Sequence, residues 1–183
     1  MLILGRRSLT TLERVIETLR EAGIQFAVIG ASGMAVHGVL RSTLDIDLLT
    51  TNRQVLKKKM WDRLVHGGFE ADIRFGDISD PLVGVVTVSV DADRPVDLIV
   101  GEAPWQERII EEAASGFVAG MDLPVASLVG LILLKLYAGG PQDCWDIKQL
   151  RRRAGDPDKL EREISERVLN LPVRAQKLWE ALV

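Results

Sequence analysis

The chain has 183 residues, 47% of them hydrophobic and 27% charged, which is typical of a folded protein with one buried core and room for a small appended helical lobe. Its net charge of −3 argues against broad non-specific binding to nucleic acid, and its single cysteine, Cys144, excludes an internal disulfide and a multi-cysteine zinc site. The longest apolar run, residues 123–134, is too short to span a bilayer, and no secretory signal is apparent. We therefore expect a cytoplasmic protein with no membrane partner.

The first half of the chain alternates between helical and strand patterns. Leu12, Val15, Ile16 and Leu19 recur with helical spacing and predict a helix over 9–22, with Thr10 or Thr11 as its cap. The next predicted elements are a strand at 24–29, a turn at Gly30, a short helix at 32–38, a strand at 43–49, a helix at 54–67 with Lys57, Lys58 and Lys59 on its outer side, and a strand at 69–75. After a turn-rich stretch at 76–81, strands at 83–90 and 96–100 are predicted to form a hairpin, followed by a helix at 104–114 and a short edge strand at 117–119.

The second half of the chain is helical in pattern from residue 125 onward. Breaks that contain glycine or proline separate four predicted helices, at 128–138, 142–153, 158–169 and 173–182. The chain is therefore expected to consist of an α/β core, residues 1–122, followed by a C-terminal helical lobe, residues 123–183.

Two aspartates, Asp45 and Asp47, stand one residue apart in an apolar strand pattern. Side chains of a strand alternate between its faces, so both carboxylates project from the same side, with their Cα atoms about 6.5 Å apart. Two like charges on a partly buried face repel each other, and a cation would relieve that cost. The pair therefore predicts a cation site.

A third aspartate, Asp97, interrupts the apolar strand at 96–100. If that strand lies beside the one that carries Asp45 and Asp47, the three carboxylates form a hard oxygen site suited to Mg²⁺ or Mn²⁺. A solvated aspartate on an edge strand is the structural alternative for Asp97. Asp91 and Asp93 repeat the Asp-x-Asp spacing, but they lie in a predicted hairpin turn, where aspartate serves local hydrogen bonding, so we assign them no catalysis.

The turn at Gly30 precedes the acidic strand and is a candidate phosphate site. A strand that ends in Gly-Ala-Ser and opens a helix exposes unpaired N–H groups to an anion, and Ser32 could donate to a phosphate oxygen. Capping of the helix by Ser32 is the structural alternative. The turn is weak evidence alone, but its combination with the acidic strand is more specific.

These residues resemble the nucleotidyltransferase superfamily, whose fold is shared with the palm of DNA polymerase β. The family pattern is an apolar strand, Gly-Gly or Gly-Ser, about ten residues, Asp-apolar-Asp, and a third acidic residue on a later strand. The positions that match are Gly30, Ser32, Asp45, Asp47 and Asp97. Ala31 departs from the pattern, because the family more often has Gly or Ser there.

A narrower resemblance is to the AbiEii-like branch, which includes toxins of toxin–antitoxin systems. Its helix Lys-Leu-x-Ala followed by Asp-x-x-Asp-Ile is similar to Lys135-Leu-Tyr-Ala and Asp143-Cys-Trp-Asp-Ile147 here. The similarity covers roughly residues 24–150, and the C-terminus is shorter than in the longer members. The resemblance implies an antitoxin partner.

Lys135 and two aspartates carry the chemistry expected in the helical half. Lys135 stands in a helix that is apolar nearly all round, where a buried lysine is costly unless it is paired or reaches a ligand. Asp143, Asp146 and Ile147 share one helical face. In one interpretation Lys135 holds a triphosphate while Asp143 or Asp146 orients it; in the other, Lys135 and Asp146 form a structural pair. The family match favours function for Lys135 and Asp143.

Four other features carry weaker signals. Arg41 precedes the acidic strand and could meet a phosphate or be an exposed structural residue. His37 is expected to pack or cap, Cys144 has no evident histidine partner for a nucleophilic role, and the basic run 151–153 is explained by a solvated helix end or by RNA binding.

Together these patterns and the resemblance predict a metal-dependent nucleotidyltransferase that moves NMP from an NTP to an acceptor hydroxyl on RNA or tRNA, protein or a small molecule. Asp45, Asp47 and Asp97 would bind the metal, and Asp97 would help to activate the acceptor. A glycosyltransferase is disfavoured, because only 44 residues precede Asp45. The non-enzymatic alternative is a catalytically inactive nucleotidyltransferase-like binding or antitoxin protein.

Overall fold

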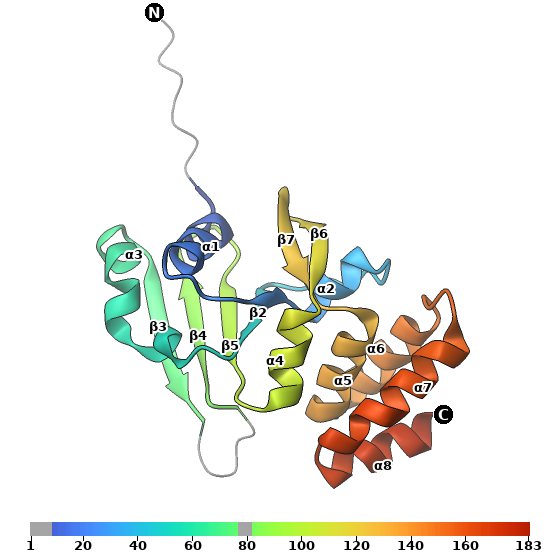
Figure 1. Cartoon of the computed structure of the whole chain (residues 1–183). Helices are drawn as coiled ribbons and strands as arrows, with labels where there is room; N and C mark the ends of the chain where they lie inside the picture. The colour runs from blue at the N-terminus through green and yellow to red at the C-terminus, as the bar shows by residue number, and fades with distance from the viewer. Residues whose placement is uncertain (1–8, 77–81) are drawn as a thin grey trace, which may run out of the picture.

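The chain folds around a mixed sheet, and the computed structural model describes residues 9–76 and 82–183. Within this described part, seven strands are ordered β3-β4-β5-β2-β1-β7-β6 (Figure 1). They are β1 (Ala27–Val28), β2 (Ile46–Thr50), β3 (Glu70–Phe75), β4 (Gly84–Ser89), β5 (Val96–Val100), β6 (Ala114–Val118) and β7 (Met121–Val125). The predicted α/β class is confirmed, and β4 and β5 form the predicted antiparallel hairpin. The turn expected at 76–81 lies mostly outside the described residues.

Helices cover both faces of this sheet. They are α1 (Thr11–Glu21), α2 (Gly30–Val36), α3 (Asp62–His66), α4 (Pro104–Glu111), α5 (Leu128–Ala138), α6 (Pro141–Arg151), α7 (Pro157–Arg167) and α8 (Val173–Leu182), with 3₁₀ turns η1 (Arg53–Leu56), η2 (Lys58–Trp61) and η3 (Val168–Asn170). Helices α5 to α8 stand together at the side away from α1 and α3 (Figure 1) and agree with the four helices predicted for the second half.

The two faces of the sheet belong to two separate hydrophobic cores. Leu48 of β2 packs in the core that contains α1, whereas Leu49 packs in the core that contains α4 and α5. This alternation places the odd-numbered residues of β2, Asp47 among them, on the side of α5. The sheet therefore carries its acidic residues toward the C-terminal helices.

The first helix shows how closely the sequence specifies local structure. Thr10 caps α1 with a capping box, in which its hydroxyl accepts from the Glu13 N–H while the Glu13 carboxylate accepts from the Thr10 N–H. The stripe of apolar residues predicted from the 3.6-residue period is buried against the sheet. Both the cap and the buried face were predicted.

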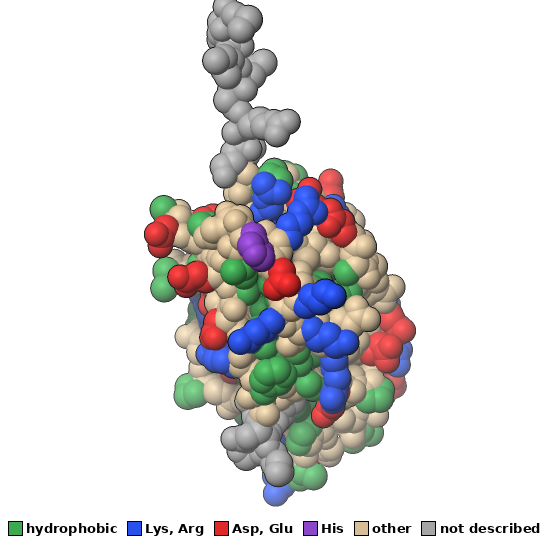
Figure 2. Space-filling view, turned by 90° about the vertical axis from the view of Figure 1, so that its left-hand side faces the viewer, with side chains coloured by type: hydrophobic (Ala, Val, Ile, Leu, Met, Phe, Trp, Pro, Cys, Tyr) green, Lys and Arg blue, Asp and Glu red, His purple; other side chains and the backbone are tan. Residues whose placement is uncertain are grey.

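The predicted helix at 54–67 is wrong for its first half. Lys57 has an extended backbone, so η1 and η2 replace the first two turns and only 62–66 is α-helical. The buried indole of Trp61 donates to the Val55 carbonyl at 2.7 Å, which fixes this non-helical path. The lysines at 57–59 are exposed as predicted, and Figure 2 shows basic side chains gathered on this side of the molecule.

The predicted short edge strand at 117–119 falls at the end of β6, which is an edge strand of the sheet but begins earlier, at Ala114, and forms one arm of a hairpin. β6 pairs with β7 across a turn at Ala119 and Gly120, both of which have positive φ. β7 also pairs with β1 through Val28 and Val125, so the strand extends across the division expected between residues 122 and 123. The division into two domains remains a prediction.

The described helices include none that is both long and apolar enough to cross a membrane.

Candidate metal and nucleotide site

Three carboxylates meet where two parallel strands begin. β2 and β5 pair in a register that sets Asp47 beside Asp97, and Asp45 immediately precedes β2. One carboxylate oxygen from each of the three residues lies within 4.8 Å of the others. All three side chains are partly buried. The structure therefore brings together the three aspartates that the sequence singled out, and it leaves Asp91 and Asp93 outside the cluster.

Neutral hydroxyls hold the two outer carboxylates. The Thr43 hydroxyl donates to Asp45 Oδ1, and the Thr87 hydroxyl donates to Asp97 Oδ1 at 2.6 Å. Arg74 in turn donates to the Thr87 hydroxyl at 3.2 Å. Thr87 is the cross-strand partner of Asp97, so the hairpin of β4 and β5 sets this contact. The sequence analysis missed these donors.

The surroundings of Asp47 disfavour the charged form of its carboxyl group. Burial, followed by repulsion from Asp45 and Asp97, raises the pKa of Asp47 to about 6, although Lys135 and Arg41 oppose the shift. A divalent cation would remove the repulsion, and carboxylate oxygens are the ligands that Mg²⁺ and Mn²⁺ prefer. The three carboxylates, which repel one another, therefore fit such a metal.

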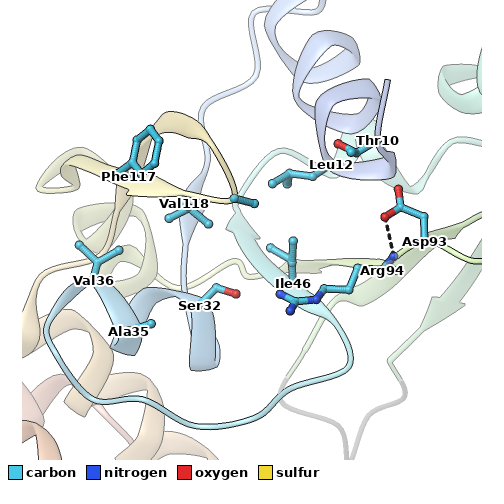
Figure 3. A pocket seen from close by; sticks show the side chains of 11 residues that line it. Thr10, Leu12, Ser32, Ala35, Val36, Ile46, Asp93, Arg94, Phe117 and Val118 are labelled. Atoms are coloured by element: carbon cyan, nitrogen blue, oxygen red, sulfur yellow. Dashed lines mark hydrogen bonds between the residues drawn. The ribbon is translucent and has the colours of Figure 1, made fainter. Parts of the chain in front are cut away.

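Gly30 lies directly against this cluster. It has a positive φ of +56°, and a Cβ at this position would lie 1.8 Å from Asp47 Oδ2. A side chain is therefore excluded for two independent reasons, conformation and space. The backbone of the Gly-Ala-Ser turn thus reaches the carboxylates. Ser32 lies two residues further along α2 and lines a different cavity (Figure 3).

A buried ion network connects the cluster to the C-terminal helices. Lys135 of α5 contacts Asp146 at 2.7 Å and Asp143 at 2.9 Å, and Arg41 contacts the same Asp146 oxygen, Oδ2, at 3.1 Å. The Asp146 side chain is fully buried, and its other oxygen accepts from Gln142. Asp146 therefore holds two cations side by side at the edge of the site.

The network keeps Lys135 charged. Burial lowers the pKa of Lys135, but its hydrogen bonds to Asp146 and Asp143 act in the opposite direction, and the net result is a raised pKa. Asp143 also accepts from the Gly140 N–H at 2.9 Å and so begins α6. The structural pair of Lys135 with Asp146 is therefore present, and the binding of a triphosphate by Lys135 stays a prediction.

A cavity of about 350 Å³ joins the cluster to the network. Gly30, Asp47, Lys135 and Asp143 contribute to its lining, together with apolar side chains that include Ile99 and Leu131. A volume of this size is within the range that accommodates a small ligand. The cavity is therefore lined both by the Asp47 carboxylate of the cluster and by the Lys135–Asp143 pair of the network.

The remaining candidates have structural partners. The His37 ring contacts the Ala126 carbonyl at 2.8 Å, which agrees with the predicted packing role. Asp93 accepts from the backbone and hydroxyl of Thr11 and so secures the start of α1. Sequence spacing could have suggested Thr43, two residues before Asp45, but the contacts of Thr87 and Gln142 depend on tertiary pairing.

The mixed sheet carries three convergent carboxylates, as the resemblance to nucleotidyltransferases implies, and comparisons with known proteins identify the family. A family model described as nucleotidyl transferase of unknown function (DUF2204) matches residues 8–178, so the chain belongs to this family. The search of curated proteins finds no match.

Solved structures with the same fold include two of the antibiotic-resistance factor ANT(2″)-Ia. One, a solution structure, has a TM-score of 0.57 at 16% identity and covers 85% of this chain and 88% of that chain. The other, in complex with adenylyl-2″-tobramycin, has a TM-score of 0.51 at 16% identity and covers 93% and 94%. An antigenic nucleotidyltransferase-like protein from Paracoccidioides brasiliensis has a TM-score of 0.51 at 16% identity and covers 93% and 90%. These likenesses confirm the fold.

Proposed function

We propose that the protein transfers NMP from an NTP to an acceptor hydroxyl in a reaction that requires Mg²⁺ or Mn²⁺. The observation that carries this proposal is the cluster of Asp45, Asp47 and Asp97, whose carboxylates repel one another and which adjoins a cavity lined by Lys135. Membership of a nucleotidyl transferase family supports the reaction class. Asp45, Asp47 and Asp97 would hold the metal, which when bound would neutralise phosphate charge and acidify the acceptor hydroxyl.

The residues around the cavity would bind and orient the NTP. Lys135, steadied by Asp143, would contact the phosphates from α5, and Arg41 would do so from the loop before β2. The Gly30 turn would bring backbone N–H groups against the phosphates, because no side chain intervenes there. Ser32, also predicted to bind phosphate, faces the other cavity, so we assign its hydroxyl to the ligand of that cavity.

Proton removal from the acceptor is the proposed task of Asp97. The acceptor oxygen bonds to the α-phosphorus, the bond from that phosphorus to pyrophosphate breaks, and the hydroxyl proton passes to a carboxylate. Thr87 donates to Asp97 Oδ1, and among the residues that the structure describes no donor contacts the other oxygen, which we assign to the proton transfer. In-line displacement of this kind depends mainly on positioning and on electrostatic stabilisation.

We further propose that the protein is the toxin of an AbiEii-like toxin–antitoxin system in the cytoplasm, with an antitoxin partner and an RNA, tRNA, protein or small-molecule acceptor. The pairing of Lys135 with Asp143 and Asp146 supports a shared role for the two matching motifs. A catalytically inactive binding or antitoxin protein is the alternative. The strain at Asp47 favours the enzyme, because a structural cluster would gain stability by losing one carboxylate.

The test is transfer of label from each α-labelled NTP, with and without Mg²⁺, to tRNA, to bulk protein and to a mixed small-molecule pool. We expect incorporation by the wild type that EDTA and Asp45→Ala abolish. Asp91→Ala is the matched control, since Asp91 is exposed and belongs to an Asp-x-Asp outside the cluster. No incorporation and no NTP binding, with wild type and Asp45→Ala alike, would contradict the enzymatic function.

A further inference from the structure

A second cavity, of about 620 Å³, lies on the other face of β2 (Figure 3). Ile46 lines it and packs in the core that contains α1, whereas Asp45 and Asp47, its neighbours in sequence, project to the opposite face. Helices α1 and α2, strand β6 and the turn at 91–94 supply the remaining lining residues. The cavity and the carboxylates thus share one strand and open at the same end of the sheet.

Most of the cavity wall is apolar and part of it is uncovered. Leu12, Ile46 and Val118 form buried wall, while Val36 is 39% and Phe117 70% exposed. Val36 and the strand of Phe117 lie close together, since a Cβ on Gly116 would meet Val36 at 2.9 Å. Apolar side chains exposed beside a cavity favour a ligand with an apolar body.

Two charged residues, Asp93 and Arg94, line the cavity, and their side chains point in different directions. In Figure 3 the Arg94 side chain extends from the turn at 91–94 across Ile46 toward Ser32. Among the described residues, the Arg94 guanidinium has no ion pair, and no residue hydrogen-bonds to the Ser32 hydroxyl. The neighbouring Asp93 carboxylate accepts from the Thr11 N–H, the Thr11 hydroxyl and the Arg94 N–H. The Asp93 carboxylate stays charged but is held at the start of α1, whereas the Arg94 guanidinium and the Ser32 hydroxyl face a molecule in the cavity.

The cavity is close enough to the carboxylates for one molecule to contact both. Ile46 is one residue from Asp45 and from Asp47, and successive Cα atoms lie about 3.8 Å apart. A molecule that fills the cavity and bends round the start of β2 would need to extend about 10 Å to bring a hydroxyl to the carboxylates. The NTP cavity, lined by Gly30 and Lys135, stays unobstructed because it lies on the other side of the strand.

We propose that this second cavity binds the acceptor, and that Arg94 and Ser32 select an acceptor with an apolar body and one anionic group, a carboxylate or a phosphate. The inference rests on the proposed transfer function and specifies its substrate class. The Arg94 guanidinium would repel the ammonium groups of a polyamine acceptor, and the Asp93 carboxylate is already bound to the N–H and hydroxyl of Thr11. The acceptor hydroxyl would take the NMP and release pyrophosphate as described above.

Binding can be tested without any transfer, with a pair of probes that differ in charge. 1-Anilinonaphthalene-8-sulfonate has an aromatic body and one anion, and N-phenyl-1-naphthylamine is its neutral analogue. We expect Arg94→Gln to weaken binding of the anionic probe about tenfold, the value of one charge-assisted contact, and to leave the neutral probe unchanged. Arg152→Gln, at an exposed arginine of the C-terminal half, is the control. Equal binding of the anionic probe to wild type and Arg94→Gln would overturn the anion site.

Transfer tests the acceptor role itself. A small-molecule extract is separated into anionic, neutral and cationic fractions, and each is offered with labelled NTP. We expect label in the anionic fraction alone and at least a tenfold loss with Arg94→Gln, while binding of a fluorescent NTP analogue stays unchanged. Label in the cationic fraction, or transfer that is insensitive to Arg94, would overturn the acceptor role while leaving the transfer function intact. Absence of both NTP binding and transfer in the wild type would instead refute the proposed function, and with it the acceptor role.

Discussion

Two groups of charged residues face each other in this protein, and they are balanced differently. The cluster of Asp45, Asp47 and Asp97 contains three carboxylates, and within the described part of the chain the donors to its two outer members are hydroxyls. The network around the buried Asp146 contains two carboxylates and two cations in direct contact. Charges that are balanced within the chain stabilise the native fold, whereas charges that remain unbalanced are a cost that an added ligand can remove.

Lys135 and Arg41 connect the two groups electrostatically. Lys135 and Arg41 lower the pKa of Asp47 although neither forms an ion pair with it, so the network partly offsets the repulsion in the cluster. If a triphosphate draws the two cations toward itself, Asp146 loses partners and Asp47 gains a metal. The two groups would then exchange their electrostatic roles when substrate binds.

The largest expected effect is on activity and comes from the cluster. Asp47→Asn should lower the transfer rate by at least about 10³-fold, because an interaction of several kcal/mol with the metal is lost and each 1.36 kcal/mol is tenfold. Single-turnover transfer with labelled NTP at saturating Mg²⁺ would measure it. Asp91→Asn, outside the cluster, should stay within about twofold of the wild type. A loss below tenfold for Asp47→Asn would show that this carboxylate is not a required ligand.

Substitutions in the network around Asp146 should lower the free energy of unfolding. Asp146→Ala should lower the free energy of unfolding by about 3 kcal/mol, because it leaves two cations beside a buried gap. Asp143→Ala should cost about 1 kcal/mol, because Lys135 retains Asp146 and the Asp143 side chain is partly exposed. Urea denaturation of both variants gives the two values. A larger cost for Asp143→Ala than for Asp146→Ala would reverse the structural ranking of these residues.

Removal of a charge from the cluster should stabilise the fold, in contrast to the network, and the effect should depend on pH. The folded-state pKa of Asp47, about 6, lies above its unfolded value of 3.8, so its contribution is fully present below pH 3.8 and is lost as pH rises through 6. Without metal, the wild type should lose up to about 3 kcal/mol relative to Asp47→Asn between pH 4 and 7.5. Mg²⁺ should restore this stability in the wild type at pH 7.5 and have little effect at pH 4.5. Parallel pH profiles for the two proteins would contradict the assigned strain.

Local patterns in the sequence predicted most of the fold, because most helices and strands are specified by residues that are close together in the chain. The apolar stripe and capping box of α1 and the β-branched strands of the β4–β5 hairpin needed no tertiary information. The failures occurred where tertiary contacts override local preference. Trp61 holds a 3₁₀ path in a segment of helical composition, and β7, which contains Pro124, is a strand because it pairs with both β1 and β6.

For the candidate site, too, local patterns in the sequence predicted some features, and others depend on tertiary contacts. The Asp-x-Asp spacing predicted that Asp45 and Asp47 share a face, and an aspartate in an apolar strand pointed to Asp97. The neighbouring position of Asp97 and Asp47 depends on the parallel pairing of β2 with β5, which the sequence could only suggest. The contact of Arg41 with Asp146, residues 105 positions apart, left no local signal.

The smallest expected effect concerns Thr87, the donor that holds Asp97. Thr87→Val keeps the shape of the side chain and removes the hydroxyl, so it should weaken activity about tenfold, in line with the 1.5 kcal/mol or so of one hydrogen bond to a charged group. Thr87→Ser restores the hydroxyl and should recover most of the activity. If Thr87 acts by positioning Asp97, the Mg²⁺ concentration for half-maximal thermal stabilisation should rise with Thr87→Val and return with Thr87→Ser. A Thr87→Val protein that is less stable but has an unchanged Mg²⁺ response would limit Thr87 to packing.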